Sequence, residues 1–166
     1  MASHGTGIWD IYVKRFNGTT WEEVGASSAM GSGISNTSQT NSYFPHLIFM
    51  DDGLPYVFWK EDLRGQPGYY SSDLAIWVRR FNGDIWEEIF PGSASLKGID
   101  GTTDDTDAPS VENNVGTTAF MTYNARSGSS NAIYVRRYEY SAPNAAPVRN
   151  YVTDQPTKLT WNPVTS

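Results

Sequence analysis

The chain contains no cysteine among its 166 residues, so it can form neither a disulfide framework nor a thiolate metal site. It also lacks an excess of basic residues. Its 12 Lys and Arg against 18 Asp and Glu give a net charge of −6, which disfavours nonspecific binding to nucleic acid or to anionic lipid. No apolar run reaches the roughly 18 residues that a membrane-spanning helix needs, and no signal-peptide pattern opens the sequence. The sequence therefore predicts neither nucleic-acid binding nor membrane insertion.

Large aromatic rings and turn-forming residues are abundant instead. The chain has six Trp, ten Tyr, fifteen Gly and nine Pro, and 14% of its residues are aromatic. Aromatic residues favour strands, and Gly and Pro spread along a chain supply many turns. With no stretch of helical periodicity, this composition predicts an all-β fold.

One phrase occurs almost three times. It reads IYVKRFNGTTWEEV from Ile11, IWVRRFNGDIWEEI from Ile76 and IYVRRYEY from Ile133, at offsets of 65 (76 − 11) and 57 (133 − 76) residues. A phrase that recurs at a period near 60 residues is typical of repeat architectures. In the first two copies an Asn-Gly pair separates two strand-like segments, and Asn-Gly favours the type I′ turn of a β-hairpin. Each phrase is therefore predicted to form a hairpin.

Two short apolar segments lie between the first two hairpins. HLIFM (46–50) and PYVFW (55–59) flank a turn at 51–53, and continuous apolar runs of this length are expected to be buried on both faces. Weaker counterparts follow at 109–114 and 118–123. One repeat thus holds four strands in up-and-down order, and repeated four-stranded sheets are typical of β-propeller blades. We expect an outer hairpin at 8–24, a full blade at 44–90 and a partial blade at 108–140.

The pattern between and within the hairpins resembles the repeats of bacterial sialidase-like or BNR-like β-propellers over about residues 8–140. The matching positions are Gly33-Ile34-Ser35-Asn36, Pro45, Asp52-Gly53, Pro55-Tyr56-Val57 and Trp59. The resemblance implies an extracellular or cell-surface protein. Residues 1–7 read as a tag, and residues 143–166 read as a linker followed by the start of a fibronectin type III-like domain.

We expect no catalytic residues. The Asp-box of sialidases fails to match, because Phe49 occupies its Ser position and Tyr56 its Trp position. About two and a half blades cannot assemble the three arginines, the Tyr–Glu pair and the acid Asp of that family's active site. In each of the pairs Glu22-Glu23 and Glu87-Glu88, the two side chains point to opposite faces of the strand and so do not converge. They are expected to be solvated charges that discourage edge pairing.

A non-catalytic binding or scaffolding module, with a glycan as its ligand, is the expected function. Two alternatives stay open: a fragment of a sialidase-like glycoside hydrolase that is inactive alone, and a purely structural repeat. The recurring tryptophans are expected to lie largely buried between blades, but they could instead form a platform for a sugar ring. The platform would comprise Trp21, Trp86, Arg79, Glu87, Tyr69 and Tyr70.

An acidic loop offers the hard oxygen ligands that Ca²⁺ prefers, although its spacing is not that of an EF-hand. Its carboxylates are Asp100, Asp104, Asp105 and Asp107. A solvated loop without metal is the alternative, and no other cofactor is expected.

Self-association is also expected, because an incomplete propeller would expose two blade faces. A closed assembly would cover them: two copies would pool about five or six blades, and three copies about seven or eight. We expect a dimer first and a trimer second.

Overall fold

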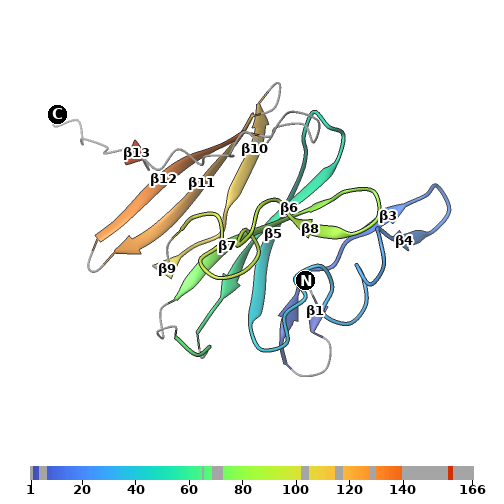
Figure 1. Cartoon of the computed structure of the whole chain (residues 1–166), viewed down its shortest axis with the longest axis horizontal. Helices are drawn as coiled ribbons and strands as arrows, with labels where there is room; N and C mark the ends of the chain where they lie inside the picture. The colour runs from blue at the N-terminus through green and yellow to red at the C-terminus, as the bar shows by residue number, and fades with distance from the viewer. Residues whose placement is uncertain are drawn as a thin grey trace, which may run out of the picture.

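The structure is a computed structural model that describes residues 2–3, 7–64, 66–68, 73–101, 105–114, 118–127, 130–139 and 157–158. This part of the chain is all β and has no helix, as the composition predicted (Figure 1). It accordingly holds no helix that is long and apolar enough to span a membrane. The strands are β1 (Ala2–Ser3), β2 (Trp9–Asp10), β3 (Lys14–Phe16), β4 (Trp21–Glu23), β5 (Asn41–Phe49), β6 (Pro55–Asp62), β7 (Leu74–Phe81), β8 (Trp86–Glu88), β9 (Asp105–Thr106), β10 (Ser110–Asn114), β11 (Thr118–Ser127), β12 (Ser130–Glu139) and β13 (Thr157–Lys158).

The central sheet has four antiparallel strands in the order β5-β6-β7-β8. Gly53 makes the β5–β6 turn with φ of 71°, and the Asp52 carboxylate accepts a hydrogen bond from the Leu54 amide in that turn. In the β7–β8 turn, the Asn82 side-chain oxygen accepts bonds from the amides of Asp84 and Ile85. The predicted up-and-down order of strands is confirmed for this repeat, and no sheet in the described residues closes on itself.

Strand β6 is covered on both faces, as predicted for residues 55–59. Val57 and Trp59 belong to a core shared with Ile11 and Val13 of the first repeat. Tyr56 and Phe58, on the opposite face, belong to a core shared with the third sheet. The central sheet is therefore sandwiched between its two neighbours in the repeat.

The same prediction was wrong for residues 46–50. Ile48 and Met50 are buried, but Leu47 is 45% and Phe49 is 57% exposed. Strand β5 is an edge strand of its sheet, and in the described residues the first repeat contributes only its hairpin and loops beside it. Leu47 and Phe49, on the same face of β5, are consequently only partly covered by the described residues.

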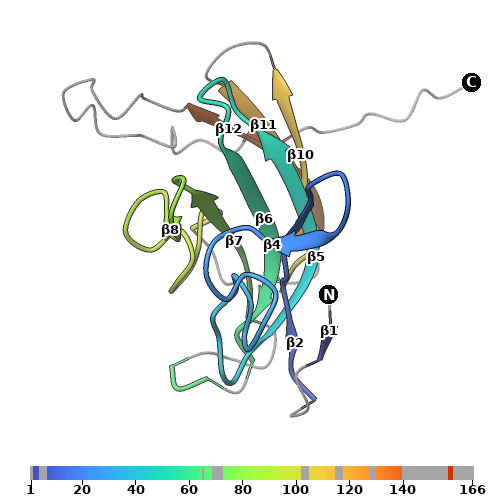
Figure 2. The same ribbon diagram turned by 90° about the vertical axis from the view of Figure 1, so that its right-hand side faces the viewer.

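The third sheet has the order β10-β11-β12-β13, with β9 paired to β11. It lies at the opposite end of the molecule from the β3–β4 hairpin, with the central sheet between them (Figures 1 and 2). Two strands come from segments expected outside the repeats: β1 pairs with β2, and β13 pairs with β12 at Tyr134 and Val135. A separate domain after residue 143 stays a prediction.

Backbone contacts repeat between the first and second repeats at the 65-residue offset. The Val13 amide bonds the Ser28 carbonyl at 2.8 Å, and the Val78 amide bonds the Ser93 carbonyl at 2.8 Å. The Ile34 amide bonds the Ile11 carbonyl, and the Ile99 amide bonds the Ile76 carbonyl, each at 2.8 Å. The sequence repeat is thus a repeat of backbone structure, including the long loop after each hairpin.

Candidate functional site

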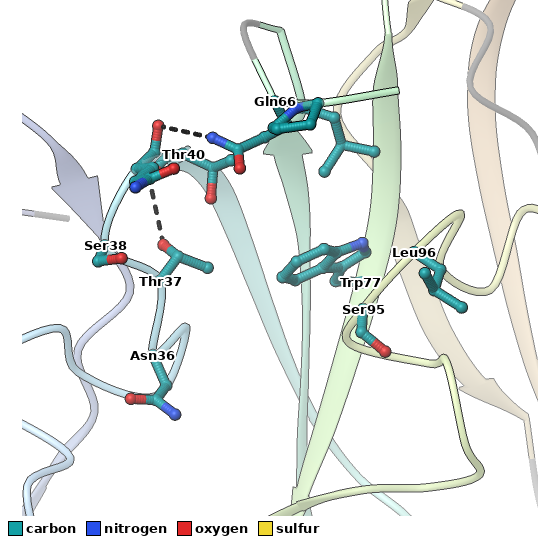
Figure 3. Close-up of a pocket in the computed structure, with 11 residues that line it drawn as sticks. Asn36, Thr37, Ser38, Thr40, Gln66, Trp77, Ser95 and Leu96 are labelled. Atoms are coloured by element: carbon teal, nitrogen blue, oxygen red, sulfur yellow. Dashed lines mark hydrogen bonds between the residues drawn. The ribbon is translucent and has the colours of Figure 1, made fainter. Parts of the chain in front are cut away.

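An open pocket of about 340 Å³ lies between the loops of the first and second repeats (Figure 3). Its size falls in the range of roughly 300–1,000 Å³ that is usual for small-molecule sites. It is lined by three segments and one strand residue: Asn36, Thr37, Ser38, Gln39 and Thr40, then Leu63, Gln66 and Pro67, then Ser95 and Leu96, with Trp77 of β7. The pocket exists only because the fold brings two consecutive repeats together.

The inner wall of the pocket is apolar. Trp77 is 7% exposed and packs edge-on against Trp59, with ring centroids 6.2 Å apart, and Leu63 is 3% exposed. Among the described residues the Trp77 indole Nε1 is buried without a hydrogen-bond partner. The counterpart in the first repeat is Tyr12, whose hydroxyl donates to the Gly31 carbonyl at 2.6 Å. The Trp77 Nε1 donor in the wall of the pocket therefore lacks a described partner, whereas Tyr12 at the equivalent position of the first repeat makes a hydrogen bond.

The rim of the pocket is polar, and several of its contacts are internal. Thr37 Oγ1 donates to the Thr40 carbonyl at 3.3 Å, and Gln66 Nε2 donates to the Gln39 carbonyl at 3.4 Å (Figure 3). The second bond joins the loop after the first hairpin to the loop after β6. These contacts hold amide and hydroxyl groups around the opening.

Among the described residues, none that lines the pocket is acidic or basic. The hydroxyls and side-chain amides can both donate and accept hydrogen bonds, whereas a carboxylate or phosphate would find no cation there. The described part of the lining therefore contributes no general acid or base. The chemistry of the pocket suits a neutral ligand rich in hydroxyl groups.

A buried carboxylate lies beneath this wall. Glu61 is fully buried, and its Oε2 accepts hydrogen bonds from Ser42 Oγ at 2.6 Å and Trp59 Nε1 at 2.7 Å. Burial raises the pKa of Glu61 to about 7, although the bonds from Ser42, Thr40 and Trp59 oppose the shift, and the charge of Asp10 adds to it. Asp10 is also fully buried. Neither carboxylate is reachable by a substrate in the pocket.

The two recurring tryptophans have different environments. Trp86 is half-buried, and its Nε1 donates to the Val24 carbonyl of the first repeat at 2.7 Å. Trp21 is 64% exposed, so the prediction that both rings are largely buried was wrong for Trp21. The reason is positional: Trp86 has the first repeat beside it, whereas no described residue occupies the same place beside Trp21.

The sequence suggested that the carboxylates of the two hairpins are solvated charges, but in the structure they make specific hydrogen bonds. Glu87 pairs with Arg80 and accepts a bond from Asn82 Nδ2 at 2.9 Å. Glu88 accepts bonds from the amides of Gly92 and Ala94, each at 3.0 Å. Glu22 and Glu23 make the matching contacts in the first repeat. The Trp-Glu-Glu sequence thus ties each hairpin to the loop that follows it.

The predicted sugar-platform residues do not meet in the pocket. Arg79 is half-buried in β7, and burial lowers the pKa of its guanidinium despite the nearby carboxylates of Glu88 and Glu61. Glu87 and Trp86 are engaged in the contacts above, and none of these residues lines the pocket. Tyr69 and Tyr70 lie outside the described residues.

The acidic loop is only partly described. Asp100 is buried, and its carboxylate accepts bonds from the Ile76 amide and Thr106 Oγ1, each at 3.1 Å. Asp107 bonds Lys60 at 3.3 Å, Asp105 lies in β9, and Asp104 is outside the described residues. Over the described part of the chain, no three His, Cys, Asp or Glu residues gather as metal ligands. Calcium binding stays a prediction.

A melting experiment tests that prediction. A calcium ion bound to the native state would stabilise it by mass action, so EDTA should lower the melting temperature and excess Ca²⁺ should restore it. A melting temperature that is the same in EDTA and in millimolar Ca²⁺ would contradict a calcium site at 100–107.

The sequence did not single out the pocket-lining residues. The lining residues at 36–40, at 63, 66 and 67, and at 95–96 become neighbours only in the folded chain. The one available signal was the change from Tyr12 to Trp77 at equivalent positions of the repeat.

No family model, curated protein or solved structure matches this chain.

Proposed function

We propose that this chain is a segment of a β-propeller that acts as a non-catalytic binding module, and that its inter-repeat pocket takes a neutral saccharide. The observation that carries the proposal is the lining of the pocket. An apolar inner wall of Trp77 and Leu63 is surrounded by uncharged amide and hydroxyl groups. A pyranose ring presents the complementary combination of C–H faces and hydroxyl groups, and aromatic walls suit such amphipathic surfaces.

Three features support the propeller assignment. The central repeat is a four-stranded meander, and its strand β6 is apolar on both faces. The adjacent repeats pack on those two faces rather than extending the sheet edge to edge. Blades stacked face to face around an axis have this arrangement. An extracellular or cell-surface location follows from the sequence resemblance and is part of the same proposal.

The electrostatics favour binding over catalysis. A glycosidase needs two carboxyl groups that converge on the scissile bond. The lining residues that the structure describes include no carboxylate, and the nearby Glu61 and Asp10 are fully buried. A sialidase-like site would also need cations to hold the carboxylate of sialic acid. The alternative of an inactive hydrolase fragment therefore has less support from this pocket than a neutral-sugar site.

The ligand class is tested by titrating the intact chain with neutral and sialylated oligosaccharides of matched length, followed by NMR and calorimetry. We expect saturable binding of a neutral saccharide, no preference for the sialylated form, and no turnover of a fluorogenic sialoside. Binding only of sialylated sugars, or hydrolysis, would favour the hydrolase fragment. The absence of any saccharide binding would favour the purely structural repeat.

The position of the ligand is tested by replacing Gln66 with alanine. Gln66 is half-buried on the pocket rim, and each lost hydrogen bond should cost about 1 kcal/mol, or roughly a fivefold loss of affinity. The matched control is Asn131→Ala, which removes an exposed amide on β12, far from the pocket. Equal affinities for the two variants would place the saccharide elsewhere.

A further inference from the structure

The β3–β4 hairpin and the third sheet lie at opposite ends of the repeat series (Figure 1), and each carries exposed apolar residues. The leading face, on the β3–β4 hairpin and the extended segment before it, carries Tyr12, Phe16 and Trp21. The trailing face, on the outer side of the third sheet, carries Phe120 and Ile133. Phe16 is 52%, Trp21 64%, Phe120 36% and Ile133 57% exposed. Phe16 and Trp21 are in contact, with ring centroids 5.6 Å apart, whereas Phe120 pairs with Arg137, four residues along β12 from Ile133. Large exposed apolar residues that share one face mark interaction surfaces more often than scattered ones do.

The leading face has a counterpart within the chain that is packed against the preceding repeat. At the 65-residue offset, Tyr12, Phe16 and Trp21 correspond to Trp77, Phe81 and Trp86 of the second repeat. Trp86 donates to the Val24 carbonyl of the first repeat at 2.7 Å. Gly25 lies so close to the Phe81 ring that a Cβ there would come within 2.7 Å of it. The leading face is therefore the surface by which one repeat docks on the repeat before it.

The trailing face has a buried counterpart too. The repeated phrase aligns Ile133 with Ile76. The cross-strand pairs Phe120–Arg137 and Tyr56–Arg80 align Phe120 with Tyr56. Tyr56 and Ile76 are 0% exposed, because they pack against the third sheet. The trailing face is thus the surface on which one repeat receives the next.

The backbone edge of the leading end is open as well. Residues 76–78 pair with β6 in the central sheet, but no described strand pairs with the equivalent residues 11–13. The hydrogen bonds of Ile11 and Val13 run to the following loop, on the other side. An unpaired segment of this kind is a template for a strand from another chain.

We propose that the leading face of one copy docks on the trailing face of a second copy, head to tail, and that the copies close into a ring. The contact would continue an interface that this chain already makes twice, between its first and second repeats and between its second and third. Because the two faces differ in their residues, the contact is heterologous, and heterologous contacts end only when a ring closes. Two copies are the smallest ring that covers every such face.

The first test is the mass of the intact chain in solution, measured by light scattering across a dilution series. We expect a particle of two copies of the 18.4 kDa chain, and three copies would also satisfy a head-to-tail ring. A monomer at all concentrations would overturn the proposal.

Single substitutions on each face distinguish head-to-tail contact from other arrangements. Trp21→Asp and Ile133→Asp should each reduce the ring to smaller species, while an equimolar mixture of the two variants should regain a pair through the one intact contact. The matched control is Ile85→Asp, which charges a comparably exposed residue (54%) at the β7–β8 turn, in neither face. Circular dichroism checks that the variants fold, and Phe16→Asp with Phe120→Asp is the second pair if one does not.

Two outcomes would contradict the geometry. If Ile133→Asp associates as the unmodified chain does while Trp21→Asp does not, the leading faces pair with each other and the proposal is wrong. If Ile85→Asp disrupts association as strongly as the other two, the contact does not lie on the two faces. Because saccharide binding is measured separately, loss of the ring and loss of the sugar site can be told apart.

Discussion

Replacing Gly98 with alanine should remove a large share of the protein's stability. Gly98 has φ of +63°, which alanine adopts at a cost of about 1–2 kcal/mol. A Cβ at this position would also lie 2.1 Å from the Ile76 carbonyl oxygen and 2.7 Å from Trp77 Cδ1. The carbonyl is held in place, because it accepts the Ile99 amide at 2.8 Å. Relief of the overlap must break that bond, so we expect a total cost above about 4 kcal/mol, against a typical stability of about 5–15 kcal/mol.

Urea denaturation followed by tryptophan fluorescence measures this cost, and Gly53→Ala is the matched control. Gly53 has a similar φ of +71°, but no atom lies within 4 Å of its would-be Cβ, so it isolates the backbone strain. Gly33→Ala should behave like Gly98→Ala, because its Cβ would lie 2.1 Å from the Ile11 carbonyl. Equal losses of stability for Gly53→Ala and Gly98→Ala would contradict a steric clash between the new Cβ and the Ile76 carbonyl.

The sequence predicted those parts of the fold that depend on local patterns. The repeated phrase and its Asn-Gly pairs specify hairpins, and the continuous apolar run at 55–59 specifies a strand covered on both faces. The same reasoning failed for Leu47 and Phe49, since a sequence pattern does not reveal whether a neighbouring repeat covers a given face. Trp21 and Trp86 illustrate the point: they have equivalent places in the pattern but different neighbours.

The candidate site was less predictable because it depends on contacts between distant segments. Gln66 donates a hydrogen bond to Gln39, which is 27 residues away in the sequence. Trp77 and Ser95 line the same pocket from other segments. Glu88 looked like an exposed strand charge, yet it accepts the amides of the following loop. Short polar residues in long loops carry little information about which of them share a pocket.

Stability should fall as the pH rises from 5 to 8. Burial raises the pKa of Glu61 from 4.5 to about 7 and that of Asp100 from 3.8 to about 7. Between the unfolded and folded pKa values the folded state keeps protons that the unfolded state has lost, so the free energy of unfolding decreases as pH rises. The full shifts correspond to about 3 kcal/mol for Glu61 and about 4 kcal/mol for Asp100. The carboxylates of Glu22, Glu88 and Asp107 have lowered pKa values, so they change the free energy of unfolding only at lower pH.

Glu61→Gln isolates the contribution of the carboxylate beneath the pocket. An amide at this position can still accept bonds from Ser42 and Trp59, but it has no charge to desolvate. We expect the variant to be close to the unmodified protein in stability at pH 5 and more stable at pH 8, by up to about 3 kcal/mol. Urea denaturation at each pH unit measures the slope, and Glu139→Gln, at a half-exposed side chain, is the control. An unchanged slope in Glu61→Gln would mean that Glu61 is ionised in the native state throughout, stabilised by a cation or by water near Asp10 and Arg79.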